Sequence, residues 1–399
     1  MGSTAADAGP APDRPRATPG LAEVAREWGR IGVVGFGGPP AHVALLRDLC
    51  VERRGWLEPR RFEDAIAATN LLPGPASTQL AIYCAWALRG PAGGVVGGLC
   101  FIVPGLVLIV VLAALFLSGS APDWLRGAGA GAGAAVAAVA VHAGVLLGVP
   151  AWRRASGATR GRLVVWAALG GAAAATLGPW LVLVLLGCGL AEVALRRAAR
   201  GRGALSGLSP AVLALAAGAA TGGLGALAWT AFKVGALSYG GGFVIIPLMQ
   251  SDAVERFGWM TDGEFLNAVA LGQVTPGPVT HTVAVVGYAA AGVGGALLAA
   301  LVAFAPSFSF ILLGADRFHR LVANRDMRAF LDGAGPAAIG AILGSAVPLA
   351  LALGEPWQVA VLAGAAVALL VARRGVVATL LAAGAIGAVA GLLGAPLPL

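Results

Sequence analysis

Polar side chains gather around two Pro-Gly-Pro triplets of this 399-residue chain. The first triplet is Pro73-Gly74-Pro75, with Asn70, Ser77, Thr78 and Gln79 beside it. The second is Pro276-Gly277-Pro278, with Gln273, Thr275, Thr280 and His281 beside it. Because proline lacks a backbone N–H and glycine readily leaves helical geometry, we expect each triplet to break a helix and free backbone polar groups. The helix that starts after such a break points N–H groups and its positive dipole end into the break. Together with hydroxyl and amide donors, this predicts a site for a tetrahedral oxyanion.

Glycine and charged residues elsewhere are expected to complete this site. Gly37-Gly38 and Gly240-Gly241 would let the backbone closely approach a ligand or the opposing break. Arg30 and Lys233 could neutralise the charge of an anion, although long basic side chains also snorkel to the membrane interface. His281 could carry a proton near neutral pH, and a structural, hydrogen-bonded histidine is the alternative. Packing and kinks also explain glycine and proline in membrane helices, but two equivalent triplets with polar neighbours favour a functional role.

The composition predicts an integral membrane protein. Hydrophobic residues make up 58% of the chain and charged residues 12%, and the mean hydropathy is +0.84. A soluble domain is about one quarter charged. At roughly 20 residues per span plus short loops, the chain allows about a dozen membrane helices. Lys233 is the only lysine among 27 basic residues, and the arginines lie in loops between apolar runs. This pattern is typical of a positive-inside bias and excludes the basic face of a nucleic-acid-binding protein.

The sequence predicts no cofactor and no metal site. The four cysteines are isolated and form no CxxC pair, which argues against a disulfide framework or a zinc site. No Walker A phosphate-binding sequence occurs, so active transport would draw on an ion gradient or a separate subunit. Residues 1–20 are rich in Pro, Ala and Gly without an apolar core, which predicts a disordered cytoplasmic tail rather than a signal peptide.

The chain repeats itself at an offset of 203 residues. Gly37-Gly38 returns as Gly240-Gly241, Gly55-Trp56 returns as Gly258-Trp259, and the first Pro-Gly-Pro triplet returns as the second. Arg30 is matched by Lys233 and, once the offset slips by one, Pro104 is matched by Pro306. Glycine, proline and tryptophan at matched spacing are hard to obtain by chance in a chain dominated by Ala, Leu and Val. The sequence therefore predicts an internal duplication.

We expect an all-α integral membrane protein built from two inverted repeats with broken or re-entrant helices. The predicted domains are the tail 1–20, a first repeat 21–200, a connecting transmembrane helix 201–228 and a second repeat 229–399. Each repeat starts with a Gly-rich segment and a Pro-Gly-Pro segment, at 28–50 and 65–89 in the first repeat and at 229–250 and 264–290 in the second. Four long apolar runs follow in each repeat, at 91–117, 127–149, 163–178 and 179–195 and at 292–315, 333–353, 357–373 and 376–394. With a connecting run at 211–228, these make about thirteen apolar segments.

Arginine-rich loops predict the inversion. If loops 153–162 and 196–202 are cytoplasmic, the connecting helix starts the second repeat on the opposite side, and Arg325, Arg328 and Arg373-Arg374 also fall inside. The first Gly-Trp loop, residues 47–64, carries five arginines, whereas residues 251–264 carry one arginine against Asp252, Glu255, Asp262 and Glu264. If the broken segments are re-entrant, each Gly-Trp loop lies on the side of the membrane that its charge favours. Inverted repeats with interrupted helices are typical of ion-gradient-driven transporters with a substrate site near the midplane.

At these motifs the chain resembles the chromate ion transporter (CHR) family in its long, two-domain form. The matching residues are Phe36-Gly37-Gly38-Pro39 and Leu72-Pro73-Gly74-Pro75 in the first half, and the stretches 233–242 and 272–278 in the second. The resemblance runs from about residue 21 to the end. It implies a multi-pass protein of the bacterial inner membrane with a cytoplasmic N-terminus. It also implies chromate export driven by the proton-motive force, chromate resistance and no enzyme activity.

Several alternatives stay open at this point. Uptake or exchange of sulfate is one, because chromate and sulfate are tetrahedral dianions of similar size that a backbone-amide site distinguishes poorly. A passive channel is another, whereas a chromate reductase would need flavin, haem or thiol-pair motifs that the sequence lacks. The expected partners are the oxyanion, protons and the lipid bilayer, and a homodimer is left open. We expect the two Pro-Gly-Pro breaks to face each other across a shared anion site.

Overall fold

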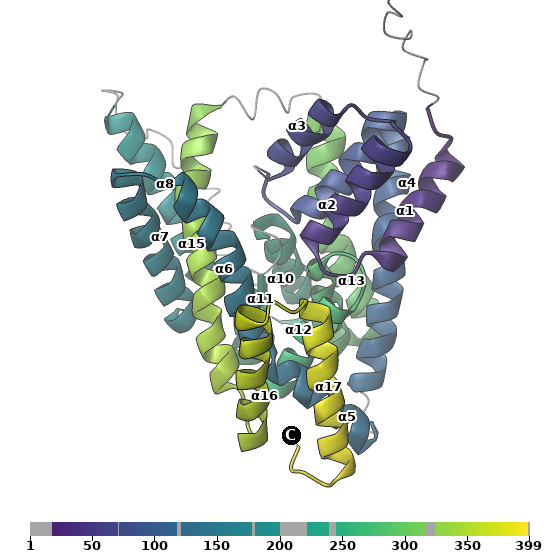
Figure 1. Cartoon of the computed structure of the whole chain (residues 1–399), viewed down its shortest axis with the longest axis vertical. Coiled ribbons are helices and arrows are strands. Elements are labelled where there is room, and N and C mark those ends of the chain that lie inside the picture. The colour runs from purple at the N-terminus through teal and green to yellow at the C-terminus, as the bar shows by residue number, and fades with distance from the viewer. Residues whose placement is uncertain are drawn as a thin grey trace, which may run out of the picture.

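The computed structural model describes residues 18–70, 72–117, 121–177, 180–199, 222–238, 245–315 and 324–397. Within these ranges every regular element is a helix (Figure 1). The expected all-α fold is thereby confirmed. The tail up to residue 17, most of the connecting segment (200–221), and the glycines Gly240 and Gly241 lie outside the described residues.

The Gly-rich segment of the first repeat forms a hairpin of two short helices. Helix α1 (Leu21–Val34) ends at Gly35, and α2 (Pro39–Arg47) begins after Gly37 and Gly38. Both glycines have left-handed backbone angles, with φ of +99° and +72°, which side-chain-bearing residues rarely adopt. The chain therefore reverses here and does not cross a membrane as one helix. A turn of π-helix, η1 (Asp48–Arg53), completes the hairpin.

The Pro-Gly-Pro segment forms a second broken element. Helix α3 (Pro59–Thr69) ends before the triplet, and α4 (Ala76–Phe116) starts directly after it. Within α4 the backbone leaves helical geometry at Arg89 and Gly90. The element is thus a half-helix from Ala76 to Arg89 followed by a long apolar helix. That long helix runs from the end of the molecule that carries α1, α2 and α3 toward the opposite end, near α5 (Asp123–Ala134) (Figure 1).

The second repeat follows the same plan. Its elements are α10 (Gly223–Leu237), α11 (Ile245–Gln250), η3 (Ser251–Arg256), α12 (Asp262–Val274), η4 (Val279–His281) and α13 (Thr282–Gly314). Glycines with positive φ recur at equivalent places, Gly258 for Gly55, Gly277 for Gly74 and Gly292 for Gly90. Because backbone geometry as well as residue type is repeated, the internal duplication is confirmed. Helix α10 begins at Gly223, inside the stretch expected to be the connecting helix.

The matching long helices α4 and α13 pack side by side in opposite directions. A side chain added at Gly94 would meet Leu312, and one added at Gly98 would meet Phe308, so the contact advances along α4 as it recedes along α13. The two helices hold equivalent positions in the two repeats. Their antiparallel contact shows that the repeats are inverted, as the arginine pattern predicts.

The remaining helices surround these broken elements. They are α5, α6 (Val136–Arg154), α7 (Ala158–Thr176) and α8 (Leu181–Ala198) in the first repeat, and α15 (Arg325–Leu351), α16 (Pro356–Ala366) with η6 (Val367–Val371), and α17 (Val376–Leu392) in the second. Helix α15 packs against α6, α7 and α8, and α5 packs against α17. Small residues allow these helices to approach closely, as at Gly170 against Ala337 and Gly340 against Ala167.

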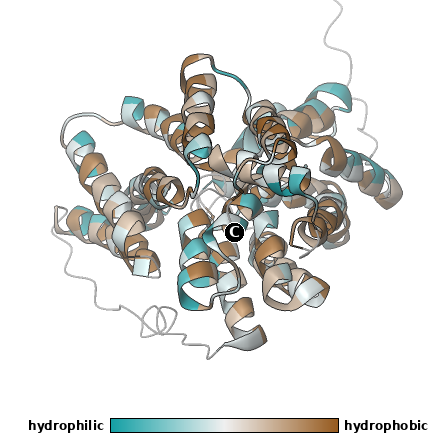
Figure 2. Cartoon of the chain, turned by 90° about the horizontal axis from the view of Figure 1, so that it is seen from below, coloured by the Kyte–Doolittle hydropathy of each residue, from teal (hydrophilic) through white to brown (hydrophobic). Residues whose placement is uncertain are grey.

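The surface of the molecule fits a lipid environment. Four helical stretches of the described residues are long and apolar enough to cross a bilayer. Large apolar side chains point outward along them, for example Val107 and Leu301, which are 58% and 70% exposed. Figure 2 shows hydrophobic segments on helices around the periphery.

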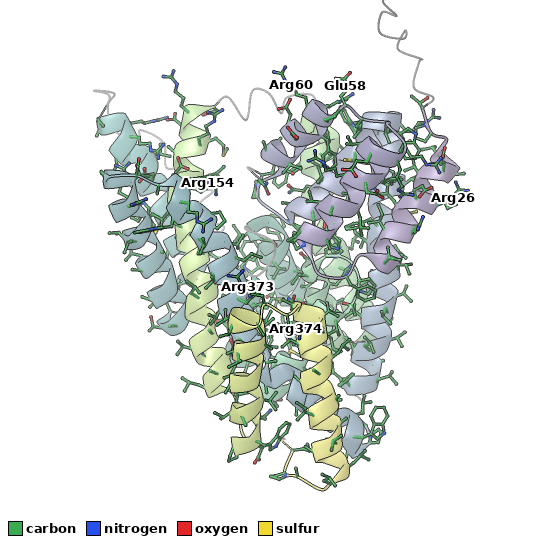
Figure 3. The ribbon with its side chains drawn as sticks, in the orientation of Figure 1. Arg26, Glu58, Arg60, Arg154, Arg373 and Arg374 are labelled. Carbon is green, nitrogen blue, oxygen red and sulfur yellow. The ribbon has the colours of Figure 1, made fainter. Side chains whose placement is uncertain are left out.

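Two arginines depart from the predicted topology. Figure 3 places Arg373 and Arg374 at mid-height of the molecule, away from the end that carries Arg26 and Arg60. They follow α16 and η6, which have 11 and 5 residues, whereas α15 has 27. This hairpin is too short to reach the end where the positive-inside pattern would have placed them. Arg26 and Arg60 do share one end of the molecule, as re-entrant hairpins require.

Candidate anion site at the helix breaks

Each Pro-Gly-Pro break contacts the other repeat. The N–H of Gly277 donates a hydrogen bond of 2.9 Å to the carbonyl of Gly35, at the first break of the first repeat. On the other side, a Cβ placed on Gly74 would lie 3.2 Å from the carbonyl of Gly235, on α10 of the second repeat. The breaks are therefore cross-paired, each triplet lying against the first hairpin of the opposite repeat.

Only glycine fits the middle of either triplet. Gly74 has φ of +116° and Gly277 has φ of +96°, both in the left-handed region. A Cβ on Gly74 would lie 2.6 Å from Gln79 Nε2, and one on Gly277 would lie 2.9 Å from the ring of His281. Both backbone shape and available space thus require glycine, as expected for a break that lines a tight site.

His42 links the turn between α1 and α2 to the Pro-Gly-Pro break of the same repeat. Its Nε2 lies 2.9 Å from the carbonyl of Gly35, and its Nδ1 lies 3.1 Å from Ser77 Oγ at the start of α4. The side chain is fully buried. Its symmetry mate at the offset of 203 residues is Ile245, so the repeat does not single this residue out. The available signal was a lone histidine four residues after a glycine pair in an apolar segment.

Several polar atoms at the breaks have no hydrogen-bonding partner within the described residues. Gln79 Nε2 donates to the freed carbonyl of Pro73 at 2.7 Å, but its Oε1 is unpaired. The other unpaired atoms there are Thr78 Oγ1, Ser238 Oγ, Gln273 Nε2, Thr280 Oγ1, Ser307 Oγ and both ring nitrogens of His281. Buried polar atoms are nearly always hydrogen-bonded to protein or to a bound partner. A cluster of unpaired hydroxyl and amide groups therefore fits a polar ligand or water.

Other predicted site residues are already engaged or lie at the edge. The Thr275 hydroxyl donates to the Leu271 carbonyl within its own helix, so it is not a free donor, contrary to expectation. Asn70 ends α3 and is exposed. His281 is buried with its ring edge against Phe304, at 5.4 Å between centroids.

The symmetry mates Arg30 and Lys233 lie in different environments. Arg30 is exposed on α1, as expected for a side chain at an interface. Lys233 is buried on α10 and forms an ion pair with Asp252, which sequence reasoning had treated as a loop charge. The two cations therefore do not act as an equivalent pair around one anion.

A cavity of about 660 Å³ reaches the Pro-Gly-Pro break of the first repeat from one end of the molecule. Thr69, Asn70 and Gly74 line one wall, and residues of α6, α7, α8 and α15 line the other. Its charged residues are Arg154, Arg162, Arg196, Glu192 and Asp332. Glu192 pairs with both Arg162 and Arg196, at 3.3 and 2.8 Å, and Asp332 pairs with Arg196 at 2.9 Å. Arg154 forms no ion pair within the described residues, so the cavity has an excess of positive charge.

The break of the second repeat is closed. Pro276, Gly277 and Pro278 are buried, whereas Pro73 and Asn70 are exposed. Helix α5 covers this region, and a Cβ on Gly129 would lie 2.9 Å from Asn267 Nδ2 of α12. In the described structure the 660 Å³ cavity therefore reaches the Pro-Gly-Pro break of the first repeat but not that of the second.

A family model described as "Chromate transporter" matches residues 22–193 and 225–389, one match for each repeat. The chain belongs to the chromate transporter family. The two matches span both sets of broken helices, so the site lies in the part of this transporter that defines the family. The chain is a multi-pass membrane transporter, and its family supports chromate as the substrate.

Relatives of this transporter cover nearly the whole chain. A chromate transport protein of Pseudomonas aeruginosa is 33% identical over 347 residues, 82% of this chain and 80% of the relative. One from Cupriavidus metallidurans is 29% identical over 391 residues, 92% of each chain. A probable chromate transport protein of Synechococcus elongatus is 28% identical over 340 residues, 82% of this chain and 84% of the relative. No solved structure gives a significant match.

Proposed function

We propose that this transporter exports chromate from the bacterial cytoplasm across the inner membrane, driven by the proton-motive force, and so confers chromate resistance. The N-terminus and the 660 Å³ cavity face the cytoplasm in this proposal. Arg26 of α1, Arg60 of α3 and Arg154 at the end of α6 then lie on the cytoplasmic side, in agreement with the positive-inside rule.

The observation that carries the proposal is the cluster of unpaired polar atoms where the cross-paired breaks meet. Thr78 and Thr280 each lie just after a Pro-Gly-Pro triplet, and each hydroxyl is buried without a hydrogen-bonding partner among the described residues. Helix starts after Pro75 and Pro278 add free N–H groups. Hydroxyl and N–H groups are the donors from which a tetrahedral dianion accepts hydrogen bonds.

The arginines of the cavity support the direction of loading. Cytoplasmic chromate would enter a cavity with net positive charge and meet Asn70 and Gly74 at its inner end. Opposite charge in a narrow cleft raises the local concentration of an anion. The cavity thus supplies an entry route from the cytoplasm to the first break.

Sulfate uptake or exchange is the second candidate. Hydroxyl and backbone donors recognise the four oxygens of either dianion, and no residue at the breaks distinguishes chromium from sulfur. The same scaffold would serve both ions, and direction would then depend on the gradients.

Chromate accumulation in cells tests the proposal. Expression in a chromate-sensitive bacterium should lower intracellular chromate relative to cells that express Gly74→Leu, and a protonophore should remove the difference. Higher accumulation with the wild-type protein would favour uptake and contradict export. Persistence of the difference with the protonophore would contradict gradient-driven transport.

A further inference from the structure

The second repeat contains a buried ion pair, which lies between the break that follows α10 and the far end of the molecule. Lys233 Nζ of α10 donates to Asp252 Oδ2 of η3. Thr230 Oγ1 donates to the same oxygen at 2.8 Å. Asp252 is fully buried and Lys233 is 7% exposed. Asp252 Oδ1 has no hydrogen-bonding partner in the described part of the chain, so one carboxylate oxygen is left available.

The first repeat shows that the hairpin does not need this pair. At the offset of 203 residues, Leu49 stands for Asp252, Arg30 for Lys233 and Glu27 for Thr230. Leu49 is fully buried in an apolar cluster, and η1 forms the same π-helical turn as η3. An apolar residue therefore suffices at the position of Asp252, whereas the buried carboxylate of the first repeat, Glu27, pairs with the half-exposed Arg54 at 2.9 Å. Burying charges is costly, so a pair that the fold does not require points to function.

The surroundings of the pair are almost uncharged. Helices α11 and α13 carry no ionisable residue other than tyrosine, and Lys233 is the only one on α10. The apolar side chains of Ala231, Val234, Met249 and Ala253 belong to the same buried cluster. On η3 itself Glu255 and Arg256 are exposed, and Asp262 at the start of α12 accepts a hydrogen bond from Gln250. His281, just before α13, lies instead against Gly277. The charge state of the pair is therefore set within the pair itself.

A second cavity lies beside Asp252 and is lined by its chain neighbour Ser251. It has a volume of about 210 Å³ and is lined by Gln250, Ser251 and Glu255 together with the tip of α7 and Pro348 of α15. The 660 Å³ cavity contacts the other end of α15, at Leu331. At 1.5 Å per helical residue the two contacts are about 25 Å apart along that helix. The two cavities thus open toward opposite sides of the transporter.

We propose that Asp252 and Lys233 form the proton-binding site that couples proton movement to oxyanion transport. This inference rests on the proposed function. A proton from water in the 210 Å³ cavity binds the Asp252 carboxylate, and Lys233 keeps its own proton, so the pair changes from neutral to singly positive. Lys233 lies about 7 Å along α10 from Ser238, where α10 ends at the first break of the second repeat. The unpaired positive charge of Lys233 then favours the binding of a dianion at that break.

The charges balance in a form that still allows export. A proton taken from the far side is released to the cytoplasm as the dianion leaves, so three charges move in the direction that a membrane potential negative inside favours, and the proton moves down its own gradient. By linkage, oxyanion binding and protonation of Asp252 strengthen each other by the same factor. Transport should therefore exchange about one proton for each chromate, the proton entering as the oxyanion leaves.

Proteoliposomes with an internal pH dye and radioactive chromate test this assignment. In the wild type, net chromate movement should be accompanied by proton movement, at a ratio near one. In Asp252→Asn the ratio of protons to chromate, taken from both fluxes in the same vesicles, should fall at least about tenfold. Asp123→Asn, which removes an exposed carboxylate of α5, should keep the wild-type ratio.

A second variant guards against a folding defect. Asp252→Asn leaves Lys233 buried without a counter-charge, whereas the double variant with Lys233→Gln removes both charges together. An unchanged proton ratio in either folded variant would overturn the coupling site. Absence of chromate counterflow in the wild type would instead contradict the proposed function, so the two failures are distinguishable.

Discussion

Helices α5 and α12 pack against each other, whereas their symmetry mates, α15 and α3, flank a cavity in the same molecule. On the α12 side, Gly129 and Gly133 of α5 lie directly against Asn267 and Leu266. On the α3 side the equivalent positions on α15 are Leu331 and Gly335, and both line the 660 Å³ cavity. One structural unit thus occurs here in a closed and in an open arrangement.

The difference shows how a fold with inverted repeats provides two conformational states. If each repeat can adopt either arrangement, exchanging them would close the cavity and open the opposite side, while the breaks stay near the centre. The sequence biases this choice, because Gly129 permits a close helix contact whereas its mate Leu331 does not. The variants below either abolish transport or shift the equilibrium between the open and the closed arrangement.

The largest effect is expected at the breaks that both arrangements share. Gly74→Leu and Gly277→Leu should each abolish transport, because left-handed φ and contacts under 3 Å leave no room for a side chain. Chromate flux in proteoliposomes measures the loss, and membrane insertion should persist. Gly364→Leu on α16 has no atom within 4 Å of the added Cβ and is the matched control. Wild-type flux in either break variant would mean that the triplets are only kinks.

The closed contact should open when α5 is made to resemble α15. Gly129→Leu forces a side chain onto Asn267 and should destabilise the described state by about 1–3 kcal/mol, the usual cost of overpacking. A thermal-unfolding series in detergent measures the loss. Labelling of Asn267→Cys by an impermeant thiol reagent should accelerate in the same variant. Unchanged labelling would show that the contact does not act as a gate.

The open side should close more readily when α15 is made to resemble α5. Leu331→Ala removes bulk from the cavity wall, so α3 can approach α15. Labelling of Asn70→Cys in the cavity should slow about two- to fivefold, a shift in population of less than about 1 kcal/mol. Faster labelling would indicate that the cavity is simply enlarged.

The smallest effect is expected from the cavity charge. Arg154→Gln removes the cavity arginine that has no ion pair within the described residues, and should raise the half-saturating chromate concentration about two- to threefold. High salt should reduce the difference, because exposed charges are screened. Arg126→Gln on α5 is the control, and an equal effect there would mean that net charge alone matters.

Local residue chemistry predicts the breaks and the inversion, but it does not predict their contacts. Glycine and proline act on their own backbone, so the breaks at Gly74 and Gly277 follow from the sequence. The arginine bias likewise reports the inversion. The cross-pairing of Gly277 with Gly35 depends on packing between distant segments, and so do the roles of His42 and Asp252. Thr275 was misjudged because its hydroxyl bonds within its own helix, an arrangement that spacing does not reveal.

Disulfide trapping of the two symmetry-related contacts tests the central claim most directly. In protein whose native cysteines are replaced by alanine, Gly129→Cys with Asn267→Cys should cross-link on oxidation, because the built Cβ of Gly129 lies 3.0 Å from Asn267 Cγ. Transport should then fall at least about tenfold and recover on reduction. The mate pair, Leu331→Cys with Asp64→Cys, should cross-link only when external oxyanion draws the protein into the opposite state. Full transport with the first pair cross-linked would contradict the account.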